Sequence, residues 1–356
     1  MSNGWTGSPV ATNPKDVFKD LLEVAGRVRE NLNAEIVEGV EDLPPDEAAA
    51  DQIGRFAREE RARVLEAGAS GLEKLAAGQG DEIDEDEYFG IEAIVLLEGR
   101  PAILVQGRDF VSQQGDWAVL DAHRPRIKDS LARVGRVEVA GHPRLDWLGT
   151  AFLVGTDVVM TNRHVAAEFA RGDSAGATFR QGMSARVDTG EEFGITSVDG
   201  SPEYEVTEVL GIHSEVDMAL LRVAPAAANG EPLPTPLTVA AEPPHDLIGR
   251  PVYVIGYPAA DGRRNEPEAM RRIFMDVFNV KRLQPGTATD FVADQTTLKH
   301  DCSTLGGNSG SPVFDLDDHR VLGLHFGGRF RSANFAVPLW QLQDDALIRR
   351  AGINFE

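Results

Sequence analysis

The chain has 356 residues, of which 42% are hydrophobic, and a formal net charge of −22. This length suits one large domain or two ordinary ones, and the hydrophobic content supplies a buried core and excludes global disorder. The acidic balance argues against nucleic acid and anionic membranes as partners, because phosphate contacts need clustered Lys and Arg.

The chain offers no targeting signal that we can identify. Its first residues, MSNGWTGSPVATNPKD, lack a basic region followed by an apolar stretch, so no secretory signal is expected. No run of about eighteen apolar residues occurs, so no membrane span is expected either. The single cysteine, Cys302, cannot form an internal disulfide and is expected to be a buried structural thiol. We therefore expect a cytoplasmic protein.

The N-terminal part has a helical pattern. Residues 14–32 and about 46–77 each carry apolar side chains at helical spacing among charges, and the proline-containing EDLPPDE separates them. This pattern predicts a helical hairpin that packs on itself or on a protein partner. We assign residues 1–80 to a helical extension whose role the sequence does not reveal.

Residues 81–130 are expected to form a small segment between the extension and the rest. The acidic run QGDEIDEDEYFG at 79–90 is interpreted as a solvated linker rather than a metal site. The following IEAIVLLEGRPAILVQ predicts a β-hairpin, and WAVLDAHRPRIKDSLARV predicts a partly helical segment.

From about residue 131 the pattern becomes β-rich. Short apolar runs recur between Gly and Pro turn signals: VGRVEVAG, GTAFLVG, VVMTN, MALLRV, PVYVIGYP, SPVFDL, VLGLHFGG and ANFAVPL. Such spacing predicts a β-barrel or sandwich. The final WQLQDDALIRRAG predicts a closing helix with Gly352 just past its end.

Three segments of this region each place one polar group in an apolar frame. His164 follows two strand-like runs, Asp217 opens the apolar run of DMALLRV, and Ser309 is central to STLGGNSGSPVFD. Taken singly, each has a structural explanation: a histidine at a strand end, an exposed strand-end carboxylate and a glycine-rich surface turn.

Together, the three residues meet the needs of nucleophilic catalysis. A hydroxyl nucleophile needs a base, and the base needs an orienting carboxylate. The chain order His164, Asp217, Ser309 is that of chymotrypsin-type double β-barrels and not the Ser-Asp-His order of α/β-hydrolases. Gly307 lets the backbone turn so that its N–H and that of Ser309 converge, as an oxyanion hole requires.

With these motifs the chain resembles the trypsin-like (chymotrypsin-fold) serine peptidases, closest to the bacterial branch of glutamyl endopeptidases and HtrA-like proteases. TNRHVA, DMALLRV and GGNSGSPVFD resemble the His, Asp and Ser motifs of that branch. GLHFGG resembles the strand that binds the substrate backbone. The resemblance covers about residues 134–350 and implies a mainly β, double β-barrel protease domain over residues 131–356.

The resemblance also implies a mechanism. Ser309 attacks the scissile carbonyl, His164 takes and later delivers the proton, and Asp217 orients the imidazole. The amides of Gly307 and Ser309 bind the oxyanion, and an acyl-enzyme forms on the way to hydrolysis. A protein or peptide is the implied substrate, and no cofactor or metal is implied.

The predicted substrate-binding residues are Ser303, Thr304, His325 and Gly327. Ser303 stands where trypsin has an Asp, so a preference for Lys or Arg is not expected. Thr304 and His325 match a Thr and a His of the glutamyl endopeptidases, which leads to the hypothesis of cleavage after Glu or Asp. Alternatively, both residues only shape the pocket wall, and the enzyme prefers a substrate with a small or apolar residue before the cut.

Two further points stay open at this level. A cut after Arg133 or Arg136 would expose Val134 or Val137, but VGRVEV is expected to be the first barrel strand, so we favour activation without obligatory processing. The alternatives to a serine endopeptidase are a catalytically silent peptide-binding adaptor and an esterase that uses the same triad.

Overall fold

The computed structural model describes residues 14–38, 48–95, 99–194, 200–259, 277–292, 296–329 and 333–356. Among its described residues, the chain divides into a mainly helical unit, which runs to Pro101 and includes Gln114–Asp116, and a β-rich unit, which comprises Ala102–Gln113 and the residues from Trp117 to Glu356. Neither unit has a described helix long and apolar enough to cross a membrane.

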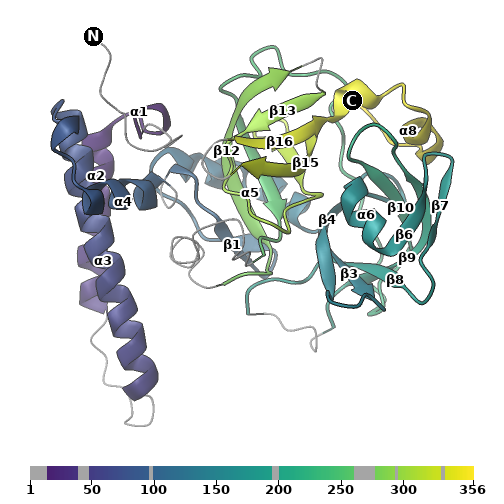
Figure 1. Ribbon diagram of the computed structural model, residues 1–356, viewed down its shortest axis with the longest axis horizontal. Helices are drawn as coiled ribbons and strands as arrows, with labels where there is room; N and C mark the ends of the chain where they lie inside the picture. Colours follow the sequence, from purple (N-terminus) through teal and green to yellow (C-terminus); the bar gives the residue numbers. More distant parts are fainter. Residues whose placement is uncertain are drawn as a thin grey trace. The chain divides into compact units, whose positions relative to one another are not determined.

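The helical unit contains four α-helices and one 3-10 turn among its described residues. They are α1 (Pro14–Val17), α2 (Leu21–Glu38), α3 (Ala48–Ala76), η2 (Gly80–Glu82) and α4 (Glu85–Ile94). Asp20 caps α2, because its carboxylate accepts the backbone N–H groups of Leu22 at 2.9 Å and Glu23 at 3.1 Å. Figure 1 shows α2, α3 and α4 packed side by side. The helix predicted at 46–77 is confirmed as α3, whereas the single helix predicted at 14–32 is two helices, α1 and α2, separated at residues 18–20. The EDLPPDE break lies outside the described residues.

The acidic run at 79–90 was expected to be a linker, and this expectation is wrong. It contains η2 and the start of α4. Asp84 and Glu87 form a capping box, in which each carboxylate accepts the other residue's backbone N–H, at 2.8 and 3.1 Å. Lys74 of α3 then binds Glu87 at 2.6 Å. The reciprocal capping and this ion pair stabilise α4. The density of charges in this run, taken alone, had suggested a solvated chain without a helix.

The expected hairpin over 91–106 is also displaced. Residues Ile91–Ile94 end α4 instead, and the hairpin joins β1 (Ile103–Gln106) to β2 (Asp109–Phe110). The predicted helical segment after it is confirmed as η4 (Gly115–Val119) and α5 (Leu120–Leu131).

The first barrel of the β-rich unit is a closed ring in the order β10-β5-β4-β3-β8-β9. Its strands are β3 (Val134–Ala140), β4 (Trp147–Leu153), β5 (Val158–Thr161), β8 (Ser184–Asp188), β9 (Glu203–Ile212) and β10 (Ala219–Val223). A short helix, α6 (Arg163–Phe169), and the hairpin of β6 (Ala170–Asp173) and β7 (Gly176–Phe179) follow β5. Apolar side chains such as Val137, Leu153, Val187 and Leu221 fill the interior.

The second barrel runs β11-β14-β15-β16-β13-β12, and the pairing of β11 with β12 closes it. Its strands are β11 (Pro251–Gly256), β12 (Arg282–Val292), β13 (Thr297–His300), β14 (Pro312–Asp315), β15 (Val321–Arg329) and β16 (Ala333–Pro338). Strand β1 extends the sheet at β12. The chain closes with η7 (Leu339–Leu342) and α8 (Ala346–Ala351), and Gly352 caps α8 in the left-handed region, as predicted.

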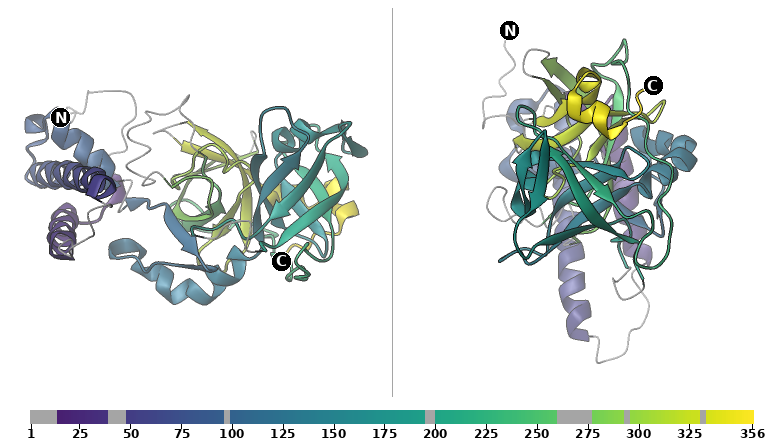
Figure 2. Two further views of the ribbon diagram at one scale, coloured as in Figure 1. Left: turned by 90° about the horizontal axis from the view of Figure 1, so that it is seen from below. Right: turned by 90° about the vertical axis from the view of Figure 1, so that its right-hand side faces the viewer.

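Figure 2 shows the two barrels, teal and green-yellow, as neighbours within this unit. The expected double β-barrel is thus confirmed. His164 and Asp217 belong to the first barrel and Ser309 to the second, so any site that uses all three has to lie where the barrels meet.

Candidate active site

His164 and Asp217 form a hydrogen-bonded pair at the end of the first barrel. His164 is the second residue of α6, and Asp217 stands two residues before β10. The His164 Nδ1 atom lies 2.6 Å from Asp217 Oδ2, and the His164 backbone N–H donates to Asp217 Oδ1 at 3.0 Å. The Asn162 amide donates to the Asp217 carbonyl at 2.9 Å and holds this loop against the end of β5.

The electrostatics of the pair favour an ionised Asp217. Burial by itself raises the pKa of this carboxyl, but the hydrogen bonds and charge of His164 outweigh it and hold the pKa below its usual range. The His164 side chain is 49% exposed, so the imidazole is anchored on one edge and open to solvent on the other.

Ser309 lies on the loop between β13 and β14. Gly307 and Gly310 on either side have φ values of +87° and +92°, which L side chains rarely adopt. A Cβ on Gly307 would lie 2.3 Å from the Tyr257 carbonyl oxygen, so glycine is also required sterically. Two hydrogen bonds from Thr150 on β4 hold this loop: its N–H donates to the Ser309 carbonyl at 2.8 Å, and its hydroxyl donates to the Gly307 carbonyl at 2.9 Å.

The same loop lies against the helix that carries His164. A Cβ on Gly149 would meet the Ser309 carbonyl oxygen at 2.7 Å and Val165 Cγ2 at 2.9 Å, so Ser309 and α6 both pack on this glycine. Within the described residues, the Ser309 hydroxyl and His164 Nε2 have no hydrogen-bond partner. The two side chains are therefore not bonded to each other here, and hydrogen bonds between catalytic groups often tighten only around substrate.

The amides of Gly307 and Ser309 are free for a ligand. Neither donates a hydrogen bond to any residue that the structure describes, whereas the carbonyl before each one is bound. Gly306 O accepts from Ala259 N at 2.6 Å, and Asn308 O accepts from Ser311 N at 2.9 Å. Because a trans peptide directs C=O and N–H to opposite sides, these bonds fix the direction in which each free N–H points.

A fully buried network of polar side chains holds the loop that carries Ser309. Asn308, just before Ser309, has an exposed fraction of 0%, and its Oδ1 accepts from the amide of Gln284 on β12 at 2.9 Å. The Asn308 amide donates to the Leu305 carbonyl at 3.3 Å. Gly256 packs against both Asn308 and Ser311, because a Cβ there would lie 2.4 Å and 2.1 Å from their side-chain oxygens. The network is uncharged, so the loop is held by hydrogen bonds and packing.

The predicted substrate-binding residues lie around this loop. Thr304 donates its hydroxyl to Asn334 Oδ1 at 2.8 Å, and Ser303 beside it is half-buried. His325 on β15 is 2% exposed and its Nδ1 lies 3.1 Å from Nε2 of His300. Burial, with a further contribution from His164, lowers the pKa of His325 to about 3, and burial also lowers that of His300. Gly327 follows on β15, opposite Phe335 of β16.

Four residues of the site escaped the sequence analysis. Thr150 clamps the loop, Ala259 binds Gly306, Gln284 binds Asn308 and His300 binds His325. Gln284 and His300 are polar groups inside strands, a pattern that marks a buried hydrogen-bond network. Nothing local distinguishes Thr150 or Ala259, because each acts through a partner distant in the chain.

The comparisons with known proteins agree with this geometry. Residues 149–324 match the family model of the trypsin-like peptidase domain. Over 206 residues the chain is 30% identical to exfoliative toxin A of Staphylococcus aureus, which covers 57% of this chain and 62% of the toxin. It is 25% identical over 191 residues to a glutamyl endopeptidase of Staphylococcus epidermidis, with 53% and 57% covered.

A third relative is serine protease Rv3671c of Mycobacterium tuberculosis, 30% identical over 195 residues, with 54% of this chain and 38% of the relative covered. The chain thus spans less than two thirds of each of these relatives. The crystal structure of the active form of Rv3671c protease matches with a TM-score of 0.43 at 20% identity, over 66% of this chain and 87% of that one. By the family model, residues 149–324 of this chain are similar to a trypsin-like peptidase domain.

Proposed function

We propose that this protein is a serine endopeptidase that hydrolyses peptide bonds through His164, Asp217 and Ser309. The observation that carries the proposal is the bonded His164–Asp217 pair beside a loop whose Gly307 and Ser309 amides have no acceptor among the described residues. These groups supply a base, its orienting carboxylate, a hydroxyl and two oxyanion donors.

The proposed reaction follows from the positions of these groups. The Ser309 hydroxyl adds to the scissile carbonyl while His164 takes its proton, and the oxyanion is held by the two amides. Collapse of the tetrahedral intermediate releases the amine, which receives that proton, and leaves an acyl-enzyme. Water then adds by the same route and regenerates Ser309. Asp217 accepts the Nδ1–H bond throughout and stabilises the imidazolium.

Covalent labelling tests this proposal against its two rivals. We expect a fluorophosphonate to label the wild-type chain and not Ser309→Ala. An adaptor that only binds peptides would not be labelled at all. An esterase would be labelled but would cleave ester substrates and leave matched peptides intact. Parallel assays on the two substrate types therefore separate all three functions.

We further propose a preference for Glu or Asp before the cleaved bond, with His325 as the recognising group. The donor pattern of the histidine pair supports this. His300 Nδ1 is buried without a partner, and an unpaired lone pair costs less than an unpaired N–H. We therefore assign the His300 proton to Nε2, which donates to His325 Nδ1 and leaves the His325 Nε2–H as a donor for a substrate carboxylate.

One relative and one contact bear on this preference. The relative is named a glutamyl endopeptidase, which supports it. The hydroxyl of Thr304 is engaged by Asn334, so it would have to turn toward a substrate to contribute. His325 thus carries more of the proposed recognition than Thr304.

A matched peptide series tests the preference. For His325→Leu we expect kcat/KM on a Glu peptide to fall at least about tenfold, because the carboxylate loses its donor. The same variant should cleave the otherwise identical Gln peptide within about twofold of wild type. Equal rates on Glu, Gln and Leu peptides in the wild-type chain would refute the preference and leave the peptidase proposal intact.

We also propose that activity needs no cut after Arg133 or Arg136. Val134 and Val137 both have an exposed fraction of 0% and belong to β3, which pairs with β4 and β8. A new terminus at Val137 would break β3 in its middle, and one at Val134 would put a charged amino group at a fully buried position. N-terminal sequencing of the labelled, active enzyme should find neither terminus, and finding one would contradict the proposal.

A further inference from the structure

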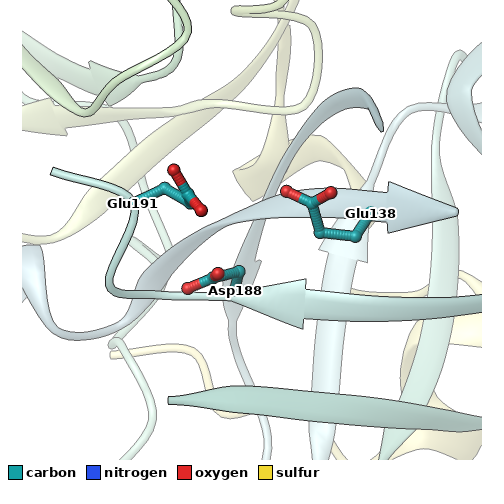
Figure 3. Close-up of side chains that lie close together, drawn as sticks. All are labelled: Glu138, Asp188 and Glu191. Carbon is teal, nitrogen blue, oxygen red and sulfur yellow. The ribbon is translucent and has the colours of Figure 1, made fainter. Parts of the chain in front are cut away.

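The first barrel holds a cluster of three carboxylates that the proposed reaction does not use. Glu138 on β3, Asp188 at the end of β8 and Glu191 have carboxylate oxygens within 4.8 Å of one another (Figure 3). Asp188 Oδ1 is bound by the N–H of Gly190 at 2.7 Å and by the hydroxyl of Ser201.

Among the described residues, the direct ion pairs of this cluster come from one guanidinium, that of Arg136. Arg136 donates Nε to Glu138, and its Nη2 lies 3.4 Å from Glu191 Oε1. Its side chain is only 13% exposed. The carboxylates therefore fix Arg136 in one conformation. Two separate chains of contacts link its guanidinium to the loop that carries Gly307 and Ser309, which we call the oxyanion loop.

The first route passes through an aromatic ring. The Arg136 guanidinium carbon lies 5.3 Å from the ring centroid of Trp147 on β4, within the range of a cation–π contact. Cross-strand pairing of Glu138 with Trp147 and of Arg136 with Thr150 sets this register. The far edge of the Trp147 ring packs on Gly307, since a Cβ on Gly307 would lie 2.6 Å from Trp147 Cη2.

The second route passes through backbone hydrogen bonds. Arg136 Nη1 donates to the Asn279 carbonyl at 2.7 Å. The Asn279 N–H donates to Pro258 O at 2.8 Å, and the next residue, Ala259, donates its N–H to Gly306 O at 2.6 Å. This route ends on the carbonyl of the same peptide bond, Gly306–Gly307, that the first route reaches from the side of Gly307.

We propose that Arg136 is a positioning residue that aims the Gly307 N–H at the oxyanion. The inference rests on the proposed peptidase function of the site. A peptide between two glycines has no Cβ to hinder its rotation, so its direction has to be imposed from outside. Arg136 imposes it by contacting the Trp147 ring on one side and by binding the Asn279 carbonyl on the other, while the Asn279 N–H binds Pro258.

The test compares Arg136→Met with Arg222→Met, an arginine of the same barrel that binds Asp157 and Glu208 and contacts no part of the oxyanion loop. The substrate is the peptide that wild type cleaves fastest, and the labelling rate with a fluorophosphonate is measured in parallel. For Arg136→Met we expect kcat and the labelling rate to fall about tenfold, while KM stays within about twofold of wild type. The expected fall is smaller than the loss of a whole oxyanion donor would cause, because the Gly307 N–H is misdirected and not removed. Arg222→Met should keep wild-type values.

Thermal unfolding shows whether Arg136→Met folds. If it does not, a second pair of variants at Trp147 tests the same proposal. Trp147→Phe keeps a ring against Gly307 and should stay within about threefold of wild-type kcat, whereas Trp147→Leu should fall about tenfold.

The outcomes are separable. Wild-type kcat in a folded Arg136→Met or in Trp147→Leu overturns the positioning role while the peptidase proposal stands. An equal loss in Arg222→Met also overturns it, because the effect would then be general destabilisation. A wild-type chain that neither cleaves nor is labelled overturns both.

Discussion

At the scale of single residues, the loop that carries Gly307 and Ser309 depends on Thr150. Its N–H and hydroxyl bind the carbonyls of Ser309 and Gly307, although Gly307 lies 157 residues further along the chain. The Thr150 carbonyl in turn accepts the Thr161 hydroxyl at 2.7 Å. The side chain is fully buried, so its hydroxyl has no water to replace the Gly307 carbonyl.

Replacing this hydroxyl should therefore affect activity more than stability. For Thr150→Val we expect kcat to fall about tenfold. The Gly307 carbonyl loses its donor, so the Gly307–Asn308 peptide, and with it the Gly307 N–H on the other side of the same residue, is less well oriented. The free energy of unfolding should fall by about 1 kcal/mol, the usual size of one lost neutral hydrogen bond. Thr150→Ser keeps the donor and should retain kcat within about threefold. Steady-state kinetics and urea unfolding check both values, and a Thr150→Val enzyme as active as Thr150→Ser would contradict the assignment.

At the scale of elements, the helical unit is organised by the crossing of α3 and α4. Gly68 and Gly90 meet there without side chains, and a Cβ on Gly68 would lie 2.3 Å from the backbone carbon of Gly90. The helices thus approach so closely that no larger residue fits. Apolar side chains beside the crossing, among them Ile91, Ile94 and Leu72, are buried.

The crossing predicts opposite effects for two glycine-to-alanine variants. Gly68→Ala should lower the stability of the helical unit by at least about 2 kcal/mol, because backbone cannot move aside as a flexible side chain can. Gly26→Ala on α2, where a Cβ meets nothing within 4 Å, should raise it by about 0.5–1 kcal/mol through helix propensity. Urea unfolding followed by far-UV circular dichroism measures both. Equal stability of the two variants would refute the close packing.

At the scale of the whole molecule, the β-rich unit contains several histidines that burial keeps neutral. Burial lowers the pKa of His325 to about 3 and, together with the charges of His123 and Arg126, that of His319 to about 4. The pKa of His300 is also well below its usual value of about 6.5. His319 hydrogen-bonds Tyr253 at 2.9 Å and contacts His123 at 3.2 Å.

These histidines make stability depend on pH with a defined sign. Below about pH 6.5 the unfolded chain binds protons at them while the folded chain does not, so the free energy of unfolding falls as the pH drops toward 4. For His319→Asn the slope between pH 6 and 5 should be shallower by up to about 1.4 kcal/mol per pH unit. Asn is chosen because it tolerates the φ of +63° at this position. Urea unfolding across this range checks the slope, and His245→Asn, at an exposed position, should leave it unchanged.

Much of the β-rich unit was predictable because its signals are local. Runs such as VGRVEVAG and PVYVIGYP became β3 and β11, and Gly352 caps α8 as expected. The acidic segment around Glu87 was misjudged because its helix depends on a capping box and on Lys74 of another helix, neither of which charge density reports. The candidate site residues His164, Asp217 and Ser309 were predicted from motif chemistry, and the supporting residues Thr150 and Gln284 were not.

The sequence by itself determined the class of the fold, and it predicted the candidate polar residues of the site and the glycine two residues before Ser309, because periodicity, residue chemistry and backbone freedom are properties of short stretches. Only the tertiary structure decided which donors bind the carbonyls of Gly306 and Gly307, which histidine lies behind His325 and what the carboxylates around Arg136 do. Each of these depends on contacts between strands of different barrels or between distant loops. Such contacts are set by register and closure of the barrels, which no short stretch of the chain encodes.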